Sequence, residues 1–348
     1  MTLFERLSLV KDRLENWWNF GDQNKPLILS SYLKPNSIIP DTDILSKFWT
    51  DLDFIIKRQI SIIENSEYIG VALPYHYIDH GSSAGSLILG SEMEFVDKET
   101  IWSHPIYNNI ESVIDIVLDE NNFSYKTIID LTRRSSELAF NHHFVAPFAL
   151  GGVSDNLAGL YGTENLLIDM IRKPQIVKKA LNNMKNIWIN NFINIQNIIQ
   201  KSKNIGGIGW VGIWAPGTTF PIQEDFSYMI SPEMFRTFLL PHIVDIAESM
   251  DYAFYHLDGV GALPHLDLIL QIDKIKVIQW VPGAGKEKIS DWYDVIKKII
   301  EHKKSCQVFI KAEEIDDLVK NVGTKGLLTV ITDSSEENVK KYLSKYLN

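Results

Sequence analysis

The stretch Tyr252-Ala-Phe-Tyr-His256-Leu-Asp258, followed by Gly259-Val-Gly261, is the most informative guide to the fold of this chain. Its apolar residues run almost without interruption, as is typical of a parallel β-strand that is buried on both faces. Side chains alternate between the two faces of a strand, so His256 and Asp258 should point the same way at the end of this one. The turn that follows contains glycine, which suits the end of a strand.

An imidazole and a carboxylate placed side by side at a strand end can hold a metal, exchange a proton or bind a polar substrate. The alternative is a buried histidine that is satisfied by the neighbouring aspartate. The functional interpretation gains weight because polar and aromatic residues follow several other strands of the chain.

Similar apolar runs recur along the whole sequence. We predict eight strands, at Leu27–Leu33, Tyr68–Pro74, Phe144–Leu150, Ile208–Trp214, Tyr252–Leu257, Lys276–Val281, Val308–Lys311 and Leu327–Ile331. Helical patterns lie between them, at Asp41–Ile63, Tyr125–Ala139, Thr163–Arg172, Pro174–Gln200, Ser231–Met250, Leu263–Gln271, Ile289–His302, Ile315–Lys320 and Glu336–Tyr346. Eight strands that alternate with helices predict an α/β fold of the (β/α)8 TIM-barrel type.

The chain is expected to form a single domain over residues 1–348, because no linker, repeat or low-complexity tract divides it. A further helix at Leu3–Trp18 would cap the floor of the barrel or brace an insertion. The segment His76–Phe123 is a long insertion after the second strand. Long loops at the carboxyl ends of barrel strands usually shape a substrate pocket, although this one could also serve only as a plug.

Composition excludes several classes of protein. The formal net charge of −10 leaves no basic surface for nucleic acid, and the single Cys306 excludes an intramolecular disulfide or a cysteine-rich metal site. We expect Cys306 to be a buried, inert thiol. The sequence shows no secretory signal and no apolar run of the roughly 20 residues that cross a bilayer. A cytoplasmic protein without a membrane partner is therefore expected, and a homodimer is left open.

In a barrel, the residues that follow the strands meet at one rim, where barrel enzymes keep their active sites. His256, Asp258 and Gln279 are the candidates for catalysis. The candidates for substrate binding are Tyr75, His76, Trp214, Asp225 and Trp280. Some of these have structural alternatives, since His76 could cap a loop and Trp280 could belong to the core.

A metal site is the more specific hypothesis for this rim. His256, Asp258 and Asp333 would supply one imidazole and two carboxylates, a set that accepts zinc or another divalent ion. Asp333 could instead be a helix cap. The spacing of these residues alone does not decide between the two interpretations.

Four segments resemble one family when they are taken together. They are Gln223-Glu-Asp-Phe-Ser227, Ser231-Pro-Glu-Met-Phe235, Tyr255-His-Leu-Asp-Gly259 with His265-Leu-Asp267, and Ile278-Gln-Trp-Val-Pro-Gly283. The chain resembles the uroporphyrinogen decarboxylase-like superfamily over nearly its whole length. The resemblance is to the branch of corrinoid-linked methyltransferases and trimethylamine corrinoid protein-like proteins.

This resemblance implies methyl transfer between a small methylated compound, a corrinoid carried by a partner protein and an acceptor. In the corrinoid-linked enzymes the fifth strand ends in His-x-Cys, which with a later cysteine binds a zinc that activates a thiol. The matching residues here are His256 and Asp258, and Asp333 stands near the place of the last ligand. The change from cysteine to aspartate puts zinc–thiolate chemistry in doubt but leaves a site that could bind a metal.

True uroporphyrinogen decarboxylases carry an arginine-rich segment near the N-terminus that binds the acidic substrate. The corresponding segment here, Pro26–Pro35, contains no arginine. Porphyrinogen decarboxylation is therefore not expected. Two other functions stay open, a lyase of the same superfamily that acts on a small carboxylate and a barrel that binds a ligand without catalysis.

Overall fold

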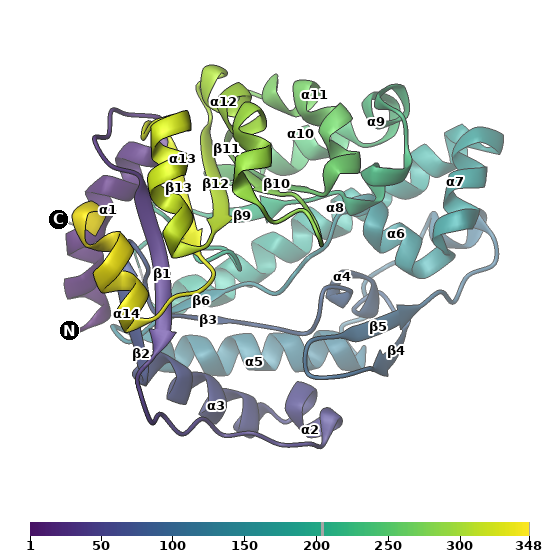
Figure 1. Cartoon of the computed structure of the whole chain (residues 1–348). Coiled ribbons are helices and arrows are strands. Elements are labelled where there is room, and N and C mark those ends of the chain that lie inside the picture. Colours follow the sequence, from purple (N-terminus) through teal and green to yellow (C-terminus); the bar gives the residue numbers. More distant parts are fainter. Residues whose placement is uncertain (203–204, 348) are drawn as a thin grey trace.

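A sheet of seven strands forms the centre of the computed structural model, which describes residues 1–202 and 205–347 (Figure 1). The strands are β1 (Leu27–Leu33), β2 (Ser66–Gly70), β9 (Thr219–Ile222), β10 (Tyr252–Asp258), β11 (Ile275–Val281), β12 (Ser305–Ile310) and β13 (Leu327–Ile331). Their order is β2-β1-β13-β12-β11-β10-β9, and every neighbouring pair is parallel except β1 and β2.

Three further pairs of strands lie outside this sheet. β3 (Tyr75–Tyr77) runs parallel to β6 (Phe144–Ala146), β4 (Glu92–Phe95) antiparallel to β5 (Ile101–His104), and β7 (Gly207–Ile208) antiparallel to β8 (Trp214–Ala215). The architecture is mixed α/β with a mostly parallel central sheet. In the described part of the chain, hydrogen bonds between strands do not close this sheet into a barrel.

Helices cover the outer side of the sheet and fill the connections. The α-helices are α1 (Leu3–Trp18), α2 (Leu45–Thr50), α3 (Leu52–Glu64), α4 (Ala84–Leu87), α5 (Phe123–Ala139), α6 (Val153–Tyr161), α7 (Thr163–Arg172), α8 (Pro174–Ile199), α9 (Pro232–Phe238), α10 (Leu240–Glu248), α11 (Leu266–Leu270), α12 (Tyr293–Glu301), α13 (Ile315–Val322), α14 (Glu336–Asn338) and α15 (Ser344–Leu347). Short 3-10 turns η1 (Ile110–Val113), η2 (Gln200–Ser202), η3 (Asp225–Met229), η4 (Val260–His265), η5 (Ile289–Trp292) and η6 (Ala312–Glu314), and the π-helical turn η7 (Val339–Leu343), complete the set. None of the helices in the described residues is at once long and apolar enough to span a membrane.

Most of the predicted elements are confirmed, and the bounds of α1, α7, β1 and β13 match the prediction. The predicted strand at Ile208–Trp214 is wrong, because only its ends are extended, as the antiparallel pair β7 and β8. The predicted cap at Ser231 is also present, since its hydroxyl accepts a hydrogen bond from the Met234 backbone N–H at 3.2 Å. A Ser at this position satisfies one of the amide groups that a helix leaves free at its start.

The predicted parallel strand at Tyr68–Pro74 is wrong. The chain forms β2 there only as far as Gly70, antiparallel to β1 at the edge of the sheet. Gly70 then adopts a left-handed φ of 63°, and a side chain at this position would collide with the Ile28 carbonyl oxygen at 2.0 Å. A glycine in this conformation turns the chain out of the strand, and the parallel strand is instead β3.

The strands separate two apolar layers. Phe254, Val277 and Leu328 belong to an inner cluster that α1 covers, whereas Tyr255, Ile278 and Leu327 belong to the layer under the outer helices. This alternation is what strands buried on both faces require. Cys306 faces the outer layer as a buried free thiol, as expected, and burial raises its pKa.

α1 closes the bottom of the inner cluster with two tryptophans. Trp17 donates its indole N–H to the Gly326 carbonyl at 2.8 Å, and Trp18 donates to the Trp214 carbonyl at 2.9 Å. Both side chains are fully buried. Buried indoles combine a large apolar surface with a hydrogen bond, so this helix contributes strongly to stability.

We therefore expect Trp18→Ala to lower the free energy of unfolding by about 3–5 kcal/mol, because it opens a cavity and leaves a carbonyl without its donor. The matched control is Leu9→Ala on the same helix, where the side chain is 66% exposed. The control should change stability by no more than about 0.5 kcal/mol. Urea unfolding of both variants measures the difference, and equal effects would contradict this role for Trp18.

Candidate functional site

Three polar side chains stand in a row across the inner face of the sheet. His256 on β10 is the register partner of Gln279 on β11, and Gln279 is the register partner of Gln307 on β12. His256 Nδ1 hydrogen-bonds to Gln279 Oε1, and Gln279 Nε2 donates to Gln307 Oε1 at 2.6 Å. Because the strands are parallel and in register, the row follows directly from the spacing of the sheet.

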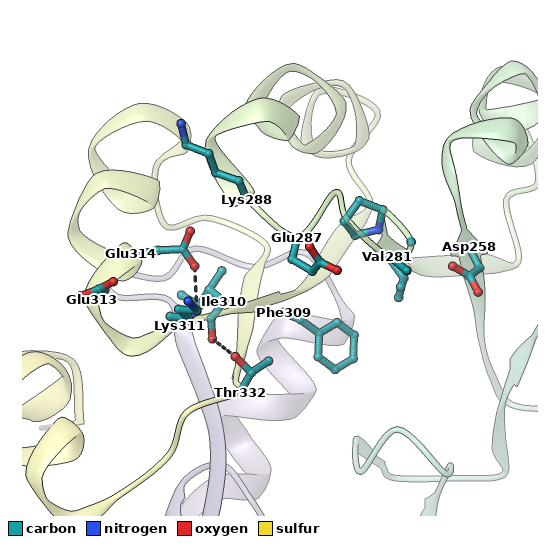
Figure 2. Close-up of a pocket in the computed structure, with 13 residues that line it drawn as sticks. Asp258, Val281, Glu287, Lys288, Phe309, Ile310, Lys311, Glu313, Glu314 and Thr332 are labelled. Carbon is teal, nitrogen blue, oxygen red and sulfur yellow. Dashed lines mark hydrogen bonds between the residues drawn. The ribbon is translucent and has the colours of Figure 1, made fainter. Parts of the chain in front are cut away.

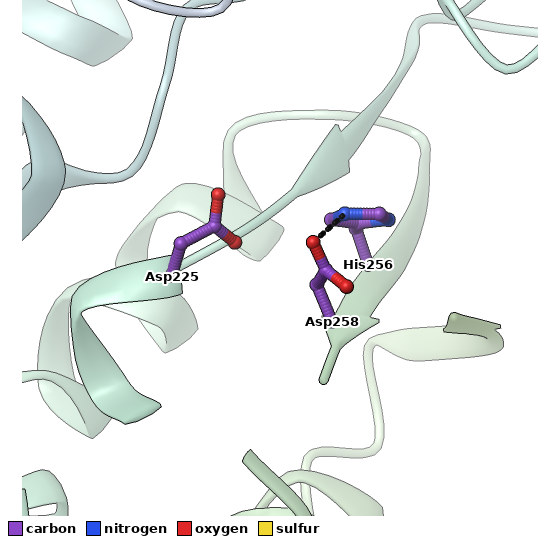
Figure 3. Close-up of side chains that lie close together, drawn as sticks. All are labelled: Asp225, His256 and Asp258. Atoms are coloured by element: carbon purple, nitrogen blue, oxygen red, sulfur yellow. Dashed lines mark ion pairs between the residues drawn. The ribbon is translucent and has the colours of Figure 1, made fainter. Parts of the chain in front are cut away.

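Two carboxylates join His256 at the carboxyl end of β10. Asp225, His256 and Asp258 each offer a ligand atom, and these atoms lie within 4.8 Å of one another. His256 Nε2 is 3.8 Å from Asp258 Oδ2, and Figure 3 shows the Asp225 carboxylate turned toward this pair. The predicted strand-end pair of His256 and Asp258 thus lies side by side, with Asp225 as a third member.

Asp225 is held in place through its backbone. It begins the turn η3 after β9, and Asp155 on α6 accepts hydrogen bonds from the backbone N–H groups of Asp225 at 3.0 Å and Phe226 at 2.6 Å. The same carboxylate accepts from Gly152 N–H at 3.1 Å. A side chain at Gly152 would come within 2.3 Å of Asp155 Oδ2 and 2.6 Å of the Gln223 carbonyl, so only glycine fits this contact.

Glu224 also holds the turn η3 against α6, through its own hydrogen bonds. Its carboxylate accepts from the backbone N–H groups of Val153 at 2.9 Å and Ser154 at 3.0 Å, and also from the Ser154 hydroxyl. These amides belong to the first turn of α6, where a helix leaves its N–H groups without partners. Asp155 and Glu224 together lock η3 onto α6, so the position of Asp225 is fixed by neighbours on both sides.

The crowding of acids changes their proton affinity. Although Asp225 is exposed, loss of hydration beside the surrounding protein and the charge of Asp155 raise the pKa of its carboxyl to about 7, against the opposing effect of His256. Burial and Asp155 also raise the pKa of Glu224 to about 8. Burial opposes the charged form of His256, but its hydrogen bond to Asp258 and the charge of Asp225 prevail and raise the pKa of the imidazole.

The cluster lies between two pockets. Asp258 lines one of about 770 Å³, formed by the loop after β11 and by residues after β12, with Lys311 and Glu314 on its opposite side (Figure 2). Asp225 and Asp155 line the other, of about 590 Å³. The second pocket is covered by the expected insertion His76–Phe123, which contributes Ser82, Ser83, Ser86, Trp102, Ser103 and Pro105.

Other residues predicted for the site lie elsewhere. Asp333 is not a member of the cluster within the described chain, since it accepts from the Ala312 backbone N–H at 2.7 Å and from the Asn338 amide at 3.0 Å. His76 points away from the inner cluster and hydrogen-bonds to Ser135 on α5 at 2.7 Å. Burial lowers the pKa of His76 to about 3.

The three aromatic residues predicted for the site lie in different parts of the molecule. Trp214 is buried beside α1, with its indole N–H bonded to the Ile205 carbonyl at 2.8 Å. Trp280 packs against Trp292 in the outer layer, with ring centroids 5.2 Å apart. Tyr75 belongs to the inner layer, and its hydroxyl donates to the Trp210 carbonyl at 3.2 Å.

Sequence reasoning did not single out three residues that shape the site. They are Asp155, Gln307 and Trp210, whose ring lies edge-on to His256 with centroids 5.2 Å apart. The alternation of side chains along β12 would have been enough to predict that Gln307 lies on the inner face. Asp155 and Trp210 lie outside the strands, and no periodic pattern marks them.

Comparison with known proteins supports the fold but not a family. No family model matches the chain, and no curated protein matches it. Among solved structures, the chain is similar to a methyltransferase from Methanosarcina mazei, with a TM-score of 0.63 and 14% sequence identity. The similarity covers 96% of this chain and 97% of that chain. At this identity it shows a shared fold alone.

The raised pKa of Asp225 predicts how stability changes with pH. The folded protein keeps this proton up to about pH 7, whereas the unfolded chain loses it near the ordinary value of 3.8. The unfolded state therefore binds fewer protons between these values, so the free energy of unfolding contributed by Asp225 falls as pH rises. In metal-free protein, Asp225→Asn should make the free energy of unfolding fall less steeply with pH. Urea unfolding between pH 4.5 and 7.5 measures this slope. An unchanged slope would contradict the shift.

Proposed function

We propose that the protein is a methyltransferase of the uroporphyrinogen decarboxylase-like superfamily. It would move a methyl group between a small methylated compound, a corrinoid carried by a separate protein and an acceptor. Support comes from the family resemblance of the four sequence segments and from a fold shared with a methyltransferase along nearly the whole chain. Neither of these alone specifies the chemistry, which depends on the site.

The observation that carries the proposal is the position of the cluster formed by Asp225, His256 and Asp258. It stands at the carboxyl ends of parallel strands, where α/β enzymes bind their substrates. One of its carboxylates faces each of the two pockets. A transfer reaction needs two reactants that meet at one point, and this arrangement provides space for both.

The donor set fits a divalent metal. One imidazole and two carboxylates converge within 4.8 Å, and two more carboxylates, Asp155 and Glu224, lie in the surrounding protein. Loss of hydration is the main cause of the raised pKa of Asp225, and the charges of Asp155 and Asp258 add to it, so a bound cation would stabilise the cluster. We propose zinc or a similar ion held by His256, Asp225 and Asp258. When bound, it would act as a Lewis acid on an acceptor.

The protein's own groups would then orient the reactants. Gln279 holds the ring of His256, Asp155 and Glu224 hold the turn that carries Asp225, and Asp258 faces the larger pocket. Tyr75 lines the inner layer near Trp210 and could bound the substrate.

A closed (β/α)8 barrel also belongs to this proposal. β3 and β6 form a parallel pair outside the seven-stranded sheet, β6 lies close to β7, and β7 lies close to β9. These short strands would complete the ring between the two edges of the sheet. Such a ring would be a barrel whose hydrogen bonding is interrupted.

A lyase that acts on a small carboxylate is the second candidate. The observation in its favour is the pKa of about 7 at Asp225, which suits a general acid or base at neutral pH. This candidate predicts activity from the carboxylates alone, in protein that contains no metal.

Metal content and methyl transfer test the proposal together. Purified protein should contain about one equivalent of a divalent metal and should transfer methyl groups to or from a corrinoid protein. His256→Ala and Asp258→Ala should each abolish both properties, while the free energy of unfolding changes by no more than about 2 kcal/mol. Elemental analysis, a methyl-transfer assay and urea unfolding measure these effects.

The identity of the third ligand has its own control. Asp225→Asn should lower metal content as strongly as Asp258→Ala, whereas Asp333→Asn should leave it unchanged, because Asp333 is bonded to Ala312 and Asn338. Lyase activity on a small carboxylate in metal-free protein would instead favour the second candidate. Loss of folding in the His256 variant would mean that the cluster is structural.

A further inference from the structure

The row formed by His256, Gln279 and Gln307 contains a residue that does not reach either pocket. Gln307 is buried, and it is not among the described residues that line the two pockets beside the cluster. Its side chain hydrogen-bonds to Gln279, its register partner on the neighbouring strand, and Gln279 in turn contacts His256. Adjacent strands lie about 4.8 Å apart, a spacing that two glutamine amides can bridge with a hydrogen bond.

The hydrogen bonds of this row have a direction. Gln279 Nε2 donates to Gln307 Oε1 at 2.6 Å, so the other end of the Gln279 amide presents its oxygen to His256 Nδ1. An amide oxygen can only accept, and the hydrogen bond therefore requires a proton on Nδ1. In the neutral ring Nε2 then carries the lone pair, and Nε2 is the atom that faces Asp258.

The opposite direction would disable the same histidine as a ligand. If the Gln279 amide turned over, its NH2 group would face Nδ1, and the ring proton would move to Nε2. A protonated Nε2 has no lone pair with which to bind a metal. The partner that fixes the Gln279 amide therefore decides which nitrogen of His256 is available.

We propose that Gln307 is a positioning residue that selects the ligand-competent tautomer of His256 through Gln279. The inference rests on the proposed metal site, for which it names a residue outside the ligand set. Residues that hydrogen-bond to a metal-binding histidine, as Gln279 does here, orient the ring in many proteins, and Gln307 would fix that partner in turn.

The unpaired nitrogen of the Gln307 amide indicates that the amide has a function other than packing. Gln307 Nε2 is buried and has no hydrogen-bond partner among the described residues, and the next register partner along the row is the apolar Leu328. A buried donor without a partner costs free energy that an apolar side chain would avoid. An amide at this position is therefore unfavourable for packing but provides the acceptor that Gln279 needs.

Zinc affinity in the whole protein tests the proposal. Gln307→Met keeps the length of the side chain and removes the amide, so we expect zinc to bind about 10- to 100-fold more weakly. Val308→Ala is the control, because it changes the next buried residue on β12, which faces the outer layer. The control should bind zinc within about twofold of the wild type. Competition with a chromophoric chelator measures both, and wild-type affinity in Gln307→Met would overturn the proposal.

A second measurement separates this inference from the metal site. Nitrogen-15 NMR of metal-free, histidine-labelled protein at alkaline pH reports the tautomer of each neutral ring, and the His256 signal is the one that His256→Ala lacks. The wild type should carry its proton on Nδ1, and Gln307→Met should shift it wholly or partly to Nε2. If the wild type binds no zinc, the metal proposal fails, but this shift still supports the role of Gln307. An unchanged tautomer overturns it.

Discussion

The parallel register of β10, β11 and β12 is the constraint on which the site depends. It sets His256, Gln279 and Gln307 at the same height on one face of the sheet. A slip of one residue on β11 would turn Gln279 outward and bring Ile278 or Trp280 to the inner face. The apolar layers prevent that slip, because Val277 is packed inside and Trp280 outside. Packing of the core and placement of the polar row are thus a single requirement.

The second constraint is the pair of buried acids that hold η3. Asp155 and Glu224 spend most of their hydrogen-bonding capacity on backbone N–H groups of α6 and η3. The charge of Asp155 also raises the pKa values of Asp225 and Glu224, in addition to the effect of burial. The carboxylates that make the site rigid therefore also place negative charges close together. A bound cation would offset the repulsion between these charges. Local structure and proton affinity are thus linked through Asp155.

The sequence predicted features that depend on neighbouring residues better than features that depend on contacts between distant parts of the chain. Strands with continuous apolar runs, such as β1 and β13, and helices with caps were predicted well, because these signals are local. β9 was missed because Pro221 interrupts its pattern, and β2 was assigned the wrong direction because nothing local reports pairing. The pairing of His256 with Asp258 followed from alternation along one strand. Asp225 was predicted at this rim as a substrate-binding residue, whereas the contact with α6 that holds it is not encoded in any local pattern.

The contacts of α1 have a consequence for how the chain is made. α1 docks through Trp17 onto Gly326 and through Trp18 onto Trp214, residues that are synthesised later than the helix itself. Until then both indoles lack their native acceptors, and the emerging polypeptide exposes an apolar surface. Folding of such long-range contacts is slow, and chaperones typically protect chains in that interval. α1 therefore cannot reach its native surroundings until the chain has been synthesised as far as Gly326.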